Sequence, residues 1–363
     1  MPDDHAATSA AQGLASGRFV RNCWYVAAWA SELAADTLLA RTLLDRPVLL
    51  FRREDGTPAA MDDTCSHRFA PLSMGKKLPG DRVQCPYHGL EFNADGQCVH
   101  NPHGNGAIPQ AAHLRGYGVV ERHQMIWIWM GDTPADPAKI PDYGCMDSTD
   151  ALFITDPGYL LMQAGYELIV DNLLDLSHTT YLHDGILGNA ETVHARINVE
   201  QDGDLITVSR PIGDVTTPGL LRGLATWESP RGDQIQTIRW FAPSCLLLQT
   251  GVTPVGRPQT EGTGFYAVHL LTPQTARTTH YFYTAARWNP LTTDAARNAE
   301  IRAHIYKMRT YAFAEQDGPV IEAQQRRIDQ LGGAPRPTLL AIDAGPVQYR
   351  RVLERMLREE GGG

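Results

Sequence analysis

The chain has 363 residues, of which 43% are hydrophobic and 20% charged, and its formal net charge is −9 at pH 7. This length suits two domains, and the composition is that of a packed globular protein rather than a disordered one. The negative charge argues against nucleic-acid binding, and no run of roughly 18 apolar residues offers a membrane span.

The N-terminal residues favour a cytoplasmic protein that begins with a loose tail. Residues 1–17 are mostly small and polar, and Asp3 and Asp4 stand where a secretion signal carries basic residues. Six cysteines are too few for a disulfide framework in a chain of this length. We therefore predict a flexible tail over 1–17 and a cytoplasmic location without a membrane anchor.

Residues 18–137 have the pattern of an all-β domain. Short β-type runs, such as 43–51 and 119–130, alternate with turn-forming residues. Between these runs, 65–109 is rich in Gly, Pro, His and Asn, which predicts a metal-braced insertion with little regular structure. The proline-rich stretch 133–137 then marks a linker.

Two cysteine-histidine pairs lie inside that insertion. They are Cys65 with His67 and Cys85 with His88, and 17 residues separate the pairs. Two thiols and two imidazoles can hold zinc or a 2Fe–2S cluster, but zinc fingers usually pair one cysteine with another cysteine and one histidine with another histidine. One ligand of each kind per loop suits a cluster in which Cys65 and Cys85 hold one iron and His67 and His88 the other.

The second half predicts a helix, several strands and a long closing helix. The first helix is expected over 167–182, and the closing helical segment over 294–331 has apolar residues at helical spacing. The strands are expected over 234–241, 245–252, 265–272 and 278–286. These elements predict an α+β domain over 138–350, an antiparallel sheet that holds a long helix, and a C-terminal tail over 351–363.

A second candidate metal site lies on the first of these helices. His178 and His183 are five residues apart, so on an ideal helix they would point about 140° apart. The helix must therefore bulge or end if both bind one metal. Two histidines and one carboxylate leave positions open on iron(II) for dioxygen. The sequence pattern leaves several carboxylates open for the third ligand: Asp171, Asp175, Asp184, Glu315, Asp317 and Glu322.

Three segments carry a family resemblance. The segments 65–73, 85–89 and 171–183 resemble the Rieske non-heme iron oxygenases, in particular the oxygenase components of aromatic O-demethylases, and the similarity runs from about residue 19 to 345. Ser66 departs from the proline that many relatives have there. The resemblance implies a Rieske 2Fe–2S cluster on Cys65, His67, Cys85 and His88, and a catalytic domain of the helix-grip type.

The same resemblance assigns roles around the second metal. It implies iron(II) held by His178, His183 and Asp317, with Gly318–Pro319 interrupting the helix so that the aspartate turns inward. It also implies that Asp175 bridges His88 of one subunit to His178 of the next, in a head-to-tail ring of three; the alternative is that Asp175 supports His178 alone.

Pocket residues follow from the resemblance as well. Strand alternation places His269 with Phe265 and Ala267, and His269 matches the histidine that meets the substrate carboxylate in an aromatic O-demethylase of this family. By itself, His269 could equally be a hydrogen-bonded core histidine. Leu248 and Met308 stand where that branch has an asparagine and a tryptophan, so the same substrate is not expected. Asn172 of the shared segment is assigned to the pocket too.

The resemblance therefore implies a terminal oxygenase that takes electrons from a ferredoxin or flavin reductase. With dioxygen it would remove an O-methyl or N-alkyl group from a small aromatic compound; the alternative is methyl-group or ring hydroxylation, including cis-dihydroxylation. A Rieske electron carrier or a zinc-stabilised binding protein are the alternatives of another class. Either would leave His178, His183 and Asp317 without a role.

Overall fold

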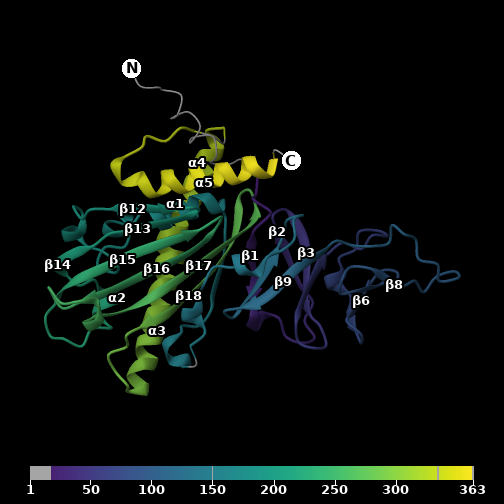
Figure 1. Ribbon diagram of the computed structural model, residues 1–363, viewed down its shortest axis with the longest axis horizontal. Coiled ribbons are helices and arrows are strands. Elements are labelled where there is room, and N and C mark those ends of the chain that lie inside the picture. Colours follow the sequence, from purple (N-terminus) through teal and green to yellow (C-terminus); the bar gives the residue numbers. More distant parts are fainter. Residues whose placement is uncertain (1–17, 149, 333–334, 362–363) are drawn as a thin grey trace. The chain divides into compact units, whose positions relative to one another are not determined.

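A computed structural model describes residues 18–148, 150–332 and 335–361 (Figure 1). The chain forms two compact units. The N-terminal unit is Phe19–Pro141 together with Thr272–Thr275, and the C-terminal unit contains Asp142–Leu271 and the residues from Ala276 onward. The boundary thus follows Pro141 rather than residue 137, and the predicted tail over 1–17 lies outside the described residues.

A six-stranded sheet forms most of the N-terminal unit. Its order is β1 (Trp24–Trp29), β10 (Met125–Trp129), β9 (Gly116–Arg122), β4 (Pro58–Asp62), β3 (Arg46–Arg52) and β2 (Leu39–Leu43). The predicted run 119–130 is a hairpin that turns at His123–Gln124, whereas the predicted run 43–51 corresponds to the single strand β3, which follows a turn at Leu44–Asp45. All four turn residues have positive φ, although none is glycine. The all-β prediction for this unit is confirmed.

A smaller sheet carries the two cysteine-histidine loops. It consists of β5 (Lys76–Leu78), β6 (Arg82–Gln84), β7 (Glu91–Asn93) and β8 (Cys98–His100), paired in that order. The prediction of little regular structure over 65–109 agrees with the structure, since four strands of three residues and one 3-10 turn are the regular elements of this segment. Cys85 lies in the connection between β6 and β7, and Cys65 precedes β5.

An eight-stranded antiparallel sheet forms the centre of the C-terminal unit. Its order is β11 (Gly158–Met162), β18 (Thr278–Trp288), β17 (Thr263–Thr275), β16 (Cys245–Thr253), β15 (Arg231–Phe241), β13 (Leu205–Ser209) and β12 (Asn198–Asp202), and β14 (Ile212–Thr216) pairs with β15. The four predicted strands correspond to β15, β16, β17 and β18, whereas β11 to β14 were not predicted. The α+β class with an antiparallel sheet is confirmed.

The helices of this unit differ from the predicted ones at their ends. They are α1 (Tyr166–Leu174), the short α2 (Gly219–Arg222), α3 (Ala295–Tyr311), α4 (Gly318–Gln330) and α5 (Ala344–Gly361). The predicted helix 167–182 stops at Leu174, and a π-helical segment, Ala312–Asp317, joins α3 to α4. Gly318 and Pro319 begin α4 rather than break a helix. The prediction of a tail over 351–363 is wrong, because α5 continues to Gly361.

Helix α5 packs against α1, the helix that precedes the histidine pair, and holds it in place. Figure 1 shows α3 running across the sheet and α5 lying beside β12 and β13, and α5 also packs on α1. The Tyr349 hydroxyl donates to the Glu167 carbonyl oxygen at 2.9 Å, and the Arg350 guanidinium pairs with the Asp171 carboxylate through both of its oxygens. No helix in the described part of the chain has the length and apolar composition needed to cross a bilayer.

Glu167 makes the stability of this junction dependent on pH. Burial raises the pKa of Glu167 to about 8, with Arg350 opposing the shift and Asp171 adding to it. Because this value lies above the ordinary value of 4.5, the folded chain binds more protons than the unfolded chain between these limits. Stability therefore falls as pH rises through this window, and it levels off above it.

We expect Glu167→Gln to remove that dependence. Between about pH 5.5 and about pH 9, the free energy of unfolding of the variant should rise by about 3 kcal/mol relative to that of the parent. The Tm of both proteins is measured at each pH, and the difference between them should grow as the pH rises. Glu200→Gln on the exposed face of β12 is the matched control and should give a Tm difference that is constant with pH. A constant difference for Glu167→Gln would show that the carboxyl is not held neutral.

Candidate metal centres and the adjoining cavity

Two backbone turns of the same design present the cysteine-histidine pairs. In the first, the Cys65 amide donates to the Ala70 carbonyl oxygen, and the Phe69 amide donates to the Cys65 carbonyl oxygen, both at 2.9 Å. The second turn repeats these bonds, from Cys85 to Leu90 at 2.8 Å and from Gly89 to Cys85 at 3.1 Å. Phe69 and Gly89 both adopt positive φ at the equivalent position. Each loop is therefore held by its own backbone.

In both turns the cysteine is buried and the histidine lies nearer the surface. Cys65 and Cys85 are buried, and each thiol lies within hydrogen-bond reach of the other. Burial, more than the neighbouring Cys85, raises the pKa of the Cys65 thiol. The imidazole rings of His67 and His88 lie 4.4 Å apart between centroids, with His67 exposed and His88 half-buried.

This arrangement fits a two-iron cluster better than zinc. Within the described residues, only His178, His183 and Asp317 bring three ligand atoms within 4.8 Å of one another. The four side chains of the two turns do not converge on one point, as a single zinc ion would require. Thiols inside and imidazoles outside suit a cluster with one iron on each pair. His103 supports the outer pair through a contact of 2.9 Å between its Nε2 and the His88 carbonyl oxygen.

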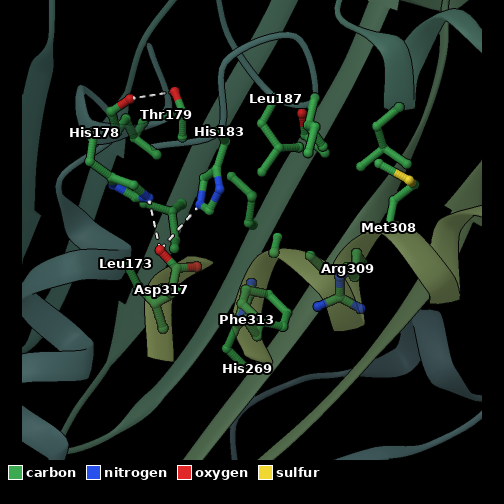
Figure 2. A pocket seen from close by; sticks show the side chains of 18 of the residues that line it. Leu173, His178, Thr179, His183, Leu187, His269, Met308, Arg309, Phe313 and Asp317 are labelled. Atoms are coloured by element: carbon green, nitrogen blue, oxygen red, sulfur yellow. Dashed lines mark hydrogen bonds and ion pairs between the residues drawn. The ribbon is translucent and has the colours of Figure 1, made fainter. Parts of the chain in front are cut away.

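His178 and His183 face one point because the chain leaves the helix between Leu174 and His178. After α1 ends, His178 begins a single 3-10 turn, His178–Thr180, and His183 lies in the loop beyond it. Asp317, the last residue of the π-helical segment, lies opposite them (Figure 2). Its Oδ1 is 3.2 Å from His183 Nε2 and 3.7 Å from His178 Nε2.

Of the six carboxylates left open by the sequence pattern, the structure brings only Asp317 to the two histidines. Asp171 pairs with Arg350, and the Asp175 carboxylate accepts a hydrogen bond from the Ser177 amide at 2.9 Å. Glu322 accepts one from the Gln163 amide at 3.0 Å. Asp184 and Glu315 are exposed.

Neighbouring groups fix the orientation of all three side chains. The ring Nδ1 of His178 contacts the Asp175 carbonyl oxygen, and that of His183 lies 2.9 Å from Gln316 Oε1. Since both partners accept, each Nδ1 carries the proton and each Nε2 lone pair is turned toward Asp317. Asn172 Nδ2 donates to Asp317 Oδ1 at 3.1 Å. Burial lowers the pKa of His178, which favours the neutral ring that binds iron(II).

Arg210 supports this segment and was missed from the sequence. Its side chain is 1% exposed and comes from the turn between β13 and β14. The guanidinium donates to the Leu176 carbonyl oxygen at 2.8 Å and to the hydroxyls of Thr179 and Thr180 at 3.2 and 3.0 Å, and it also reaches the Thr192 carbonyl oxygen. No local motif marks such a residue, because its partners lie 18 to 34 positions away.

We expect Arg210→Met to loosen the histidine-bearing segment. The carbonyl and hydroxyl groups that it leaves would be buried without a donor, and the affinity for the mononuclear iron should fall about 10- to 100-fold. Iron analysis after dialysis against a chelator measures the effect, and the cluster spectrum serves as an internal reference. Arg239→Met on the neighbouring strand β15, where the side chain is half-buried, should retain its iron. Equal retention by both variants would contradict the role.

A cavity adjoins the three side chains, and it encloses about 580 Å³ of empty space when the part open to solvent is included. It lies between β15, β16 and β17 on one side and α1, α2, α3 and the π-helical segment on the other. All four pocket residues named from the sequence line it: Asn172, Leu248, His269 and Met308. Most of the remaining wall is apolar: Leu173, Leu176, Ile186, Leu187, Leu220, Ile238, Phe265, Ala267, Ala312 and Phe313. Figure 2 shows Asp317 and the two histidines at one side of this cavity, away from Arg309 and Met308.

Comparisons with known proteins cover both units. Residues 23–114 match the Rieske [2Fe-2S] domain, and residues 162–359 match the vanillate O-demethylase oxygenase C-terminal domain. The iron-sulfur subunit of the toluene-4-sulfonate monooxygenase system of Comamonas testosteroni is 39% identical over 355 residues, 95% of this chain and 99% of that protein.

Two further relatives are equally extensive in their match. The oxygenase component of chloroacetanilide N-alkylformylase from Rhizorhabdus wittichii is 37% identical over 350 residues, 94% of this chain and 97% of that protein. The oxygenase component of dicamba O-demethylase from Stenotrophomonas maltophilia is 40% identical over 344 residues, 93% of this chain and 98% of that protein. The crystal structure of dicamba monooxygenase bound to 3,6 dichlorosalicylic acid matches with a TM-score of 0.86 and 38% identity, over 95% of this chain and 99% of that one.

Proposed function

Because the chain belongs to the Rieske non-heme iron oxygenases, in the group that shares the vanillate O-demethylase oxygenase C-terminal domain, we propose that it is a terminal oxygenase that dealkylates a substituted aromatic compound. The observation that carries this proposal is an apolar cavity bordered by His178, His183 and Asp317, in a chain that also contains the cluster-binding turns. A Rieske electron carrier would need only the two cysteine-histidine turns, and it would have no use for the three side chains or for the cavity.

The chain's own residues set up the reaction in the cavity. When bound at the three side chains, iron(II) supplies oxygen activation, and the cluster delivers the electrons. Asn172 and Gln316 keep the Asp317 and His183 side chains in position, and the apolar wall excludes water that would quench an oxidising centre. The wall also holds the alkyl group of the substrate beside the metal side.

The products follow from the chemistry of the oxidised carbon. Hydroxylation of an O-methyl or N-alkyl carbon gives a hemiacetal or hemiaminal, which collapses to a phenol or an amine and an aldehyde. One dioxygen, two electrons and two protons are consumed, and the second oxygen atom leaves as water. A ferredoxin or flavin reductase is the proposed electron source, since no dinucleotide-binding fingerprint occurs in the sequence.

We further infer a head-to-tail trimer in which His88 of one copy meets Asp175 of the next. Both side chains are half-buried and so retain surface for such a contact. A cytoplasmic location is also proposed, and the absence of any disulfide among the described residues agrees with a reducing compartment.

Product analysis tests the proposed reaction. The purified protein, a reductase and a ferredoxin are incubated with a panel of methoxybenzoates and N-alkyl anilides, and the released aldehyde and consumed dioxygen are measured. About one aldehyde released per dioxygen consumed supports dealkylation. A ring cis-diol formed without aldehyde would contradict dealkylation and show that the enzyme dihydroxylates the ring. His178→Ala is the inactive control.

A further inference from the structure

A buried carboxylate closes the first cysteine-histidine turn. Asp63 follows strand β4, two positions before Cys65, and is 7% exposed. Its Oδ1 accepts a hydrogen bond from the Ser73 amide at 2.7 Å, and its Oδ2 accepts one from the Ser73 hydroxyl at 2.6 Å. These bonds join the chain before the turn to the chain after it, so residues 63–73 form a closed loop that contains Cys65 and His67.

The second turn has a buried carboxylate as well, but the charge of that carboxylate is neutralised. Glu91 begins strand β7, directly after the turn that contains Cys85 and His88, and is 6% exposed. Its Oε2 lies 2.5 Å from the Arg82 guanidinium, and the Gln84 side-chain amide donates to its Oε1 at 3.3 Å. Glu91 and Arg82 together therefore carry no net charge.

Asp63 has no such counter-charge. Among the residues that the structure describes, no lysine or arginine forms an ion pair with it, and its side chain is bonded to Ser73 alone. Burying a carboxylate without a cation costs stability. An asparagine could form both bonds with Ser73 at lower cost, because its amide offers one acceptor and one donor. Closing the loop does not by itself require a negative charge.

Both carboxylates directly flank the cluster-binding turns. Asp63 is two positions from Cys65, and Glu91 follows Leu90, whose carbonyl oxygen accepts from the Cys85 amide. The two cysteines and Leu90 pack in one apolar cluster, and such surroundings screen a charge far less than water does. Reduction of a 2Fe–2S cluster adds one electron and turns one ferric iron into ferrous iron. A negative charge held beside the turns makes this step less favourable.

We propose that the unpaired charge of Asp63 lowers the reduction potential of the cluster, and that Arg82 prevents Glu91 from lowering it further. Asp63 is a positioning residue that also sets the potential, because Ser73 fixes its carboxylate beside the first turn. A lower potential makes the reduced cluster a stronger electron donor to the mononuclear iron. The inference depends on the cluster, and it is independent of the group that is removed from the substrate.

Redox titration of the holoenzyme tests the proposal. The cluster is titrated anaerobically in the presence of mediators, and its visible absorbance gives the midpoint potential. Asp63→Asn keeps the bonds to Ser73 and removes the charge, so the equilibrium constant for reduction should rise about tenfold, which is about 59 mV for one electron. Arg82→Gln leaves the charge of Glu91 without its cation and should lower the same constant about three- to tenfold.

Ser73→Ala and an exposed ion pair provide the controls. Ser73→Ala loses one bond and keeps the charge, so its Tm should fall while its equilibrium constant for reduction stays within about twofold of that of the parent. Arg53 and Asp95 form an ion pair of 3.3 Å on the surface of the same unit. Because water screens both charges, Arg53→Gln and Asp95→Asn should leave the potential unchanged.

Three results would overturn the proposal. They are an unchanged potential in Asp63→Asn, a shift in Ser73→Ala as large as that in Asp63→Asn, and a potential in Arg82→Gln equal to or higher than that of the parent. If Asp63→Asn does not retain its cluster, Arg82→Gln decides alone, since the Arg82 side chain is 39% exposed and its exchange should leave the fold intact. Dealkylation is tested separately, by the products, and none of these outcomes bears on it.

Discussion

Asp317→Asn is expected to remove the mononuclear iron and to abolish oxygenation. The amide keeps the shape of the carboxylate and can still accept the hydrogen bond from Asn172, so the π-helical segment should persist. What is lost is the one carboxylate, among the residues that the structure describes, that lies within 4 Å of Nε2 of both His178 and His183. Without it, two neutral imidazoles hold iron(II) weakly. Turnover should fall below about 1% of the parent, since even residues that merely orient metal ligands contribute 10- to 100-fold.

Metal analysis separates this effect from unfolding. Iron should fall from about three to about two atoms per chain, with acid-labile sulfide and the cluster spectrum unchanged. Asp184→Asn, next to His183 but exposed, is the control and should keep both iron and activity. An Asp317→Asn protein with its full iron content would show that a different carboxylate binds the metal.

Asp175→Asn is expected to leave both metals in place and to lower turnover about 100-fold. The Asp175 carboxylate accepts hydrogen bonds from the Ser177 amide and hydroxyl, and its backbone carbonyl oxygen receives His178 Nδ1. An asparagine retains each of these bonds through its own oxygen, so His178 should keep its orientation. Only the charge that would couple His88 of a neighbouring copy to His178 is removed.

A single-turnover experiment measures this prediction. The reduced protein with bound substrate is mixed with dioxygen, and the rate at which the cluster is reoxidised is followed by its visible absorbance. This rate should fall in Asp175→Asn in parallel with turnover. Ser177→Ala, which loses one bond of the same turn and keeps the charge, should reoxidise at a rate close to that of the parent. If Ser177→Ala were as slow as Asp175→Asn, the turn and not the bridge would explain the loss.

The candidate metal-binding residues could be identified from the sequence because their spacing is local. Each cysteine-histidine pair fits within one turn, and both histidines of the second site lie within six residues, so short spacings carry the signal. Asp317 could be chosen among the candidate carboxylates only through the family resemblance, because it lies 134 positions after His183 in the sequence. Helix α3 and the π-helical segment bring it to the histidines. The structure also explains how residues five apart can converge, since α1 ends before His178.

The features that were missed depend on contacts that no short pattern shows. The hairpins turn at Leu44–Asp45 and His123–Gln124, residues that give no glycine or proline signal. Helix α5 was taken for a tail, although its apolar side packs on α1 and on β12 and β13. Arg210 has its contacts with residues of other elements.

The π-helical segment determines which sequence changes near the cavity leave Asp317 in position. Arg309, Phe313 and Asp317 follow one another at intervals of four and line the same cavity. Deleting any one of residues 312–316 while α3 stays in place would turn Asp317 by about 100° around the helix axis, away from both histidines. Exchanging the side chain at position 309, by contrast, leaves the backbone of the metal-binding residue where it is. We therefore expect insertions and deletions here to abolish catalysis, and point changes one or two turns upstream to change the shape of the cavity while the candidate metal-binding side chains keep their positions.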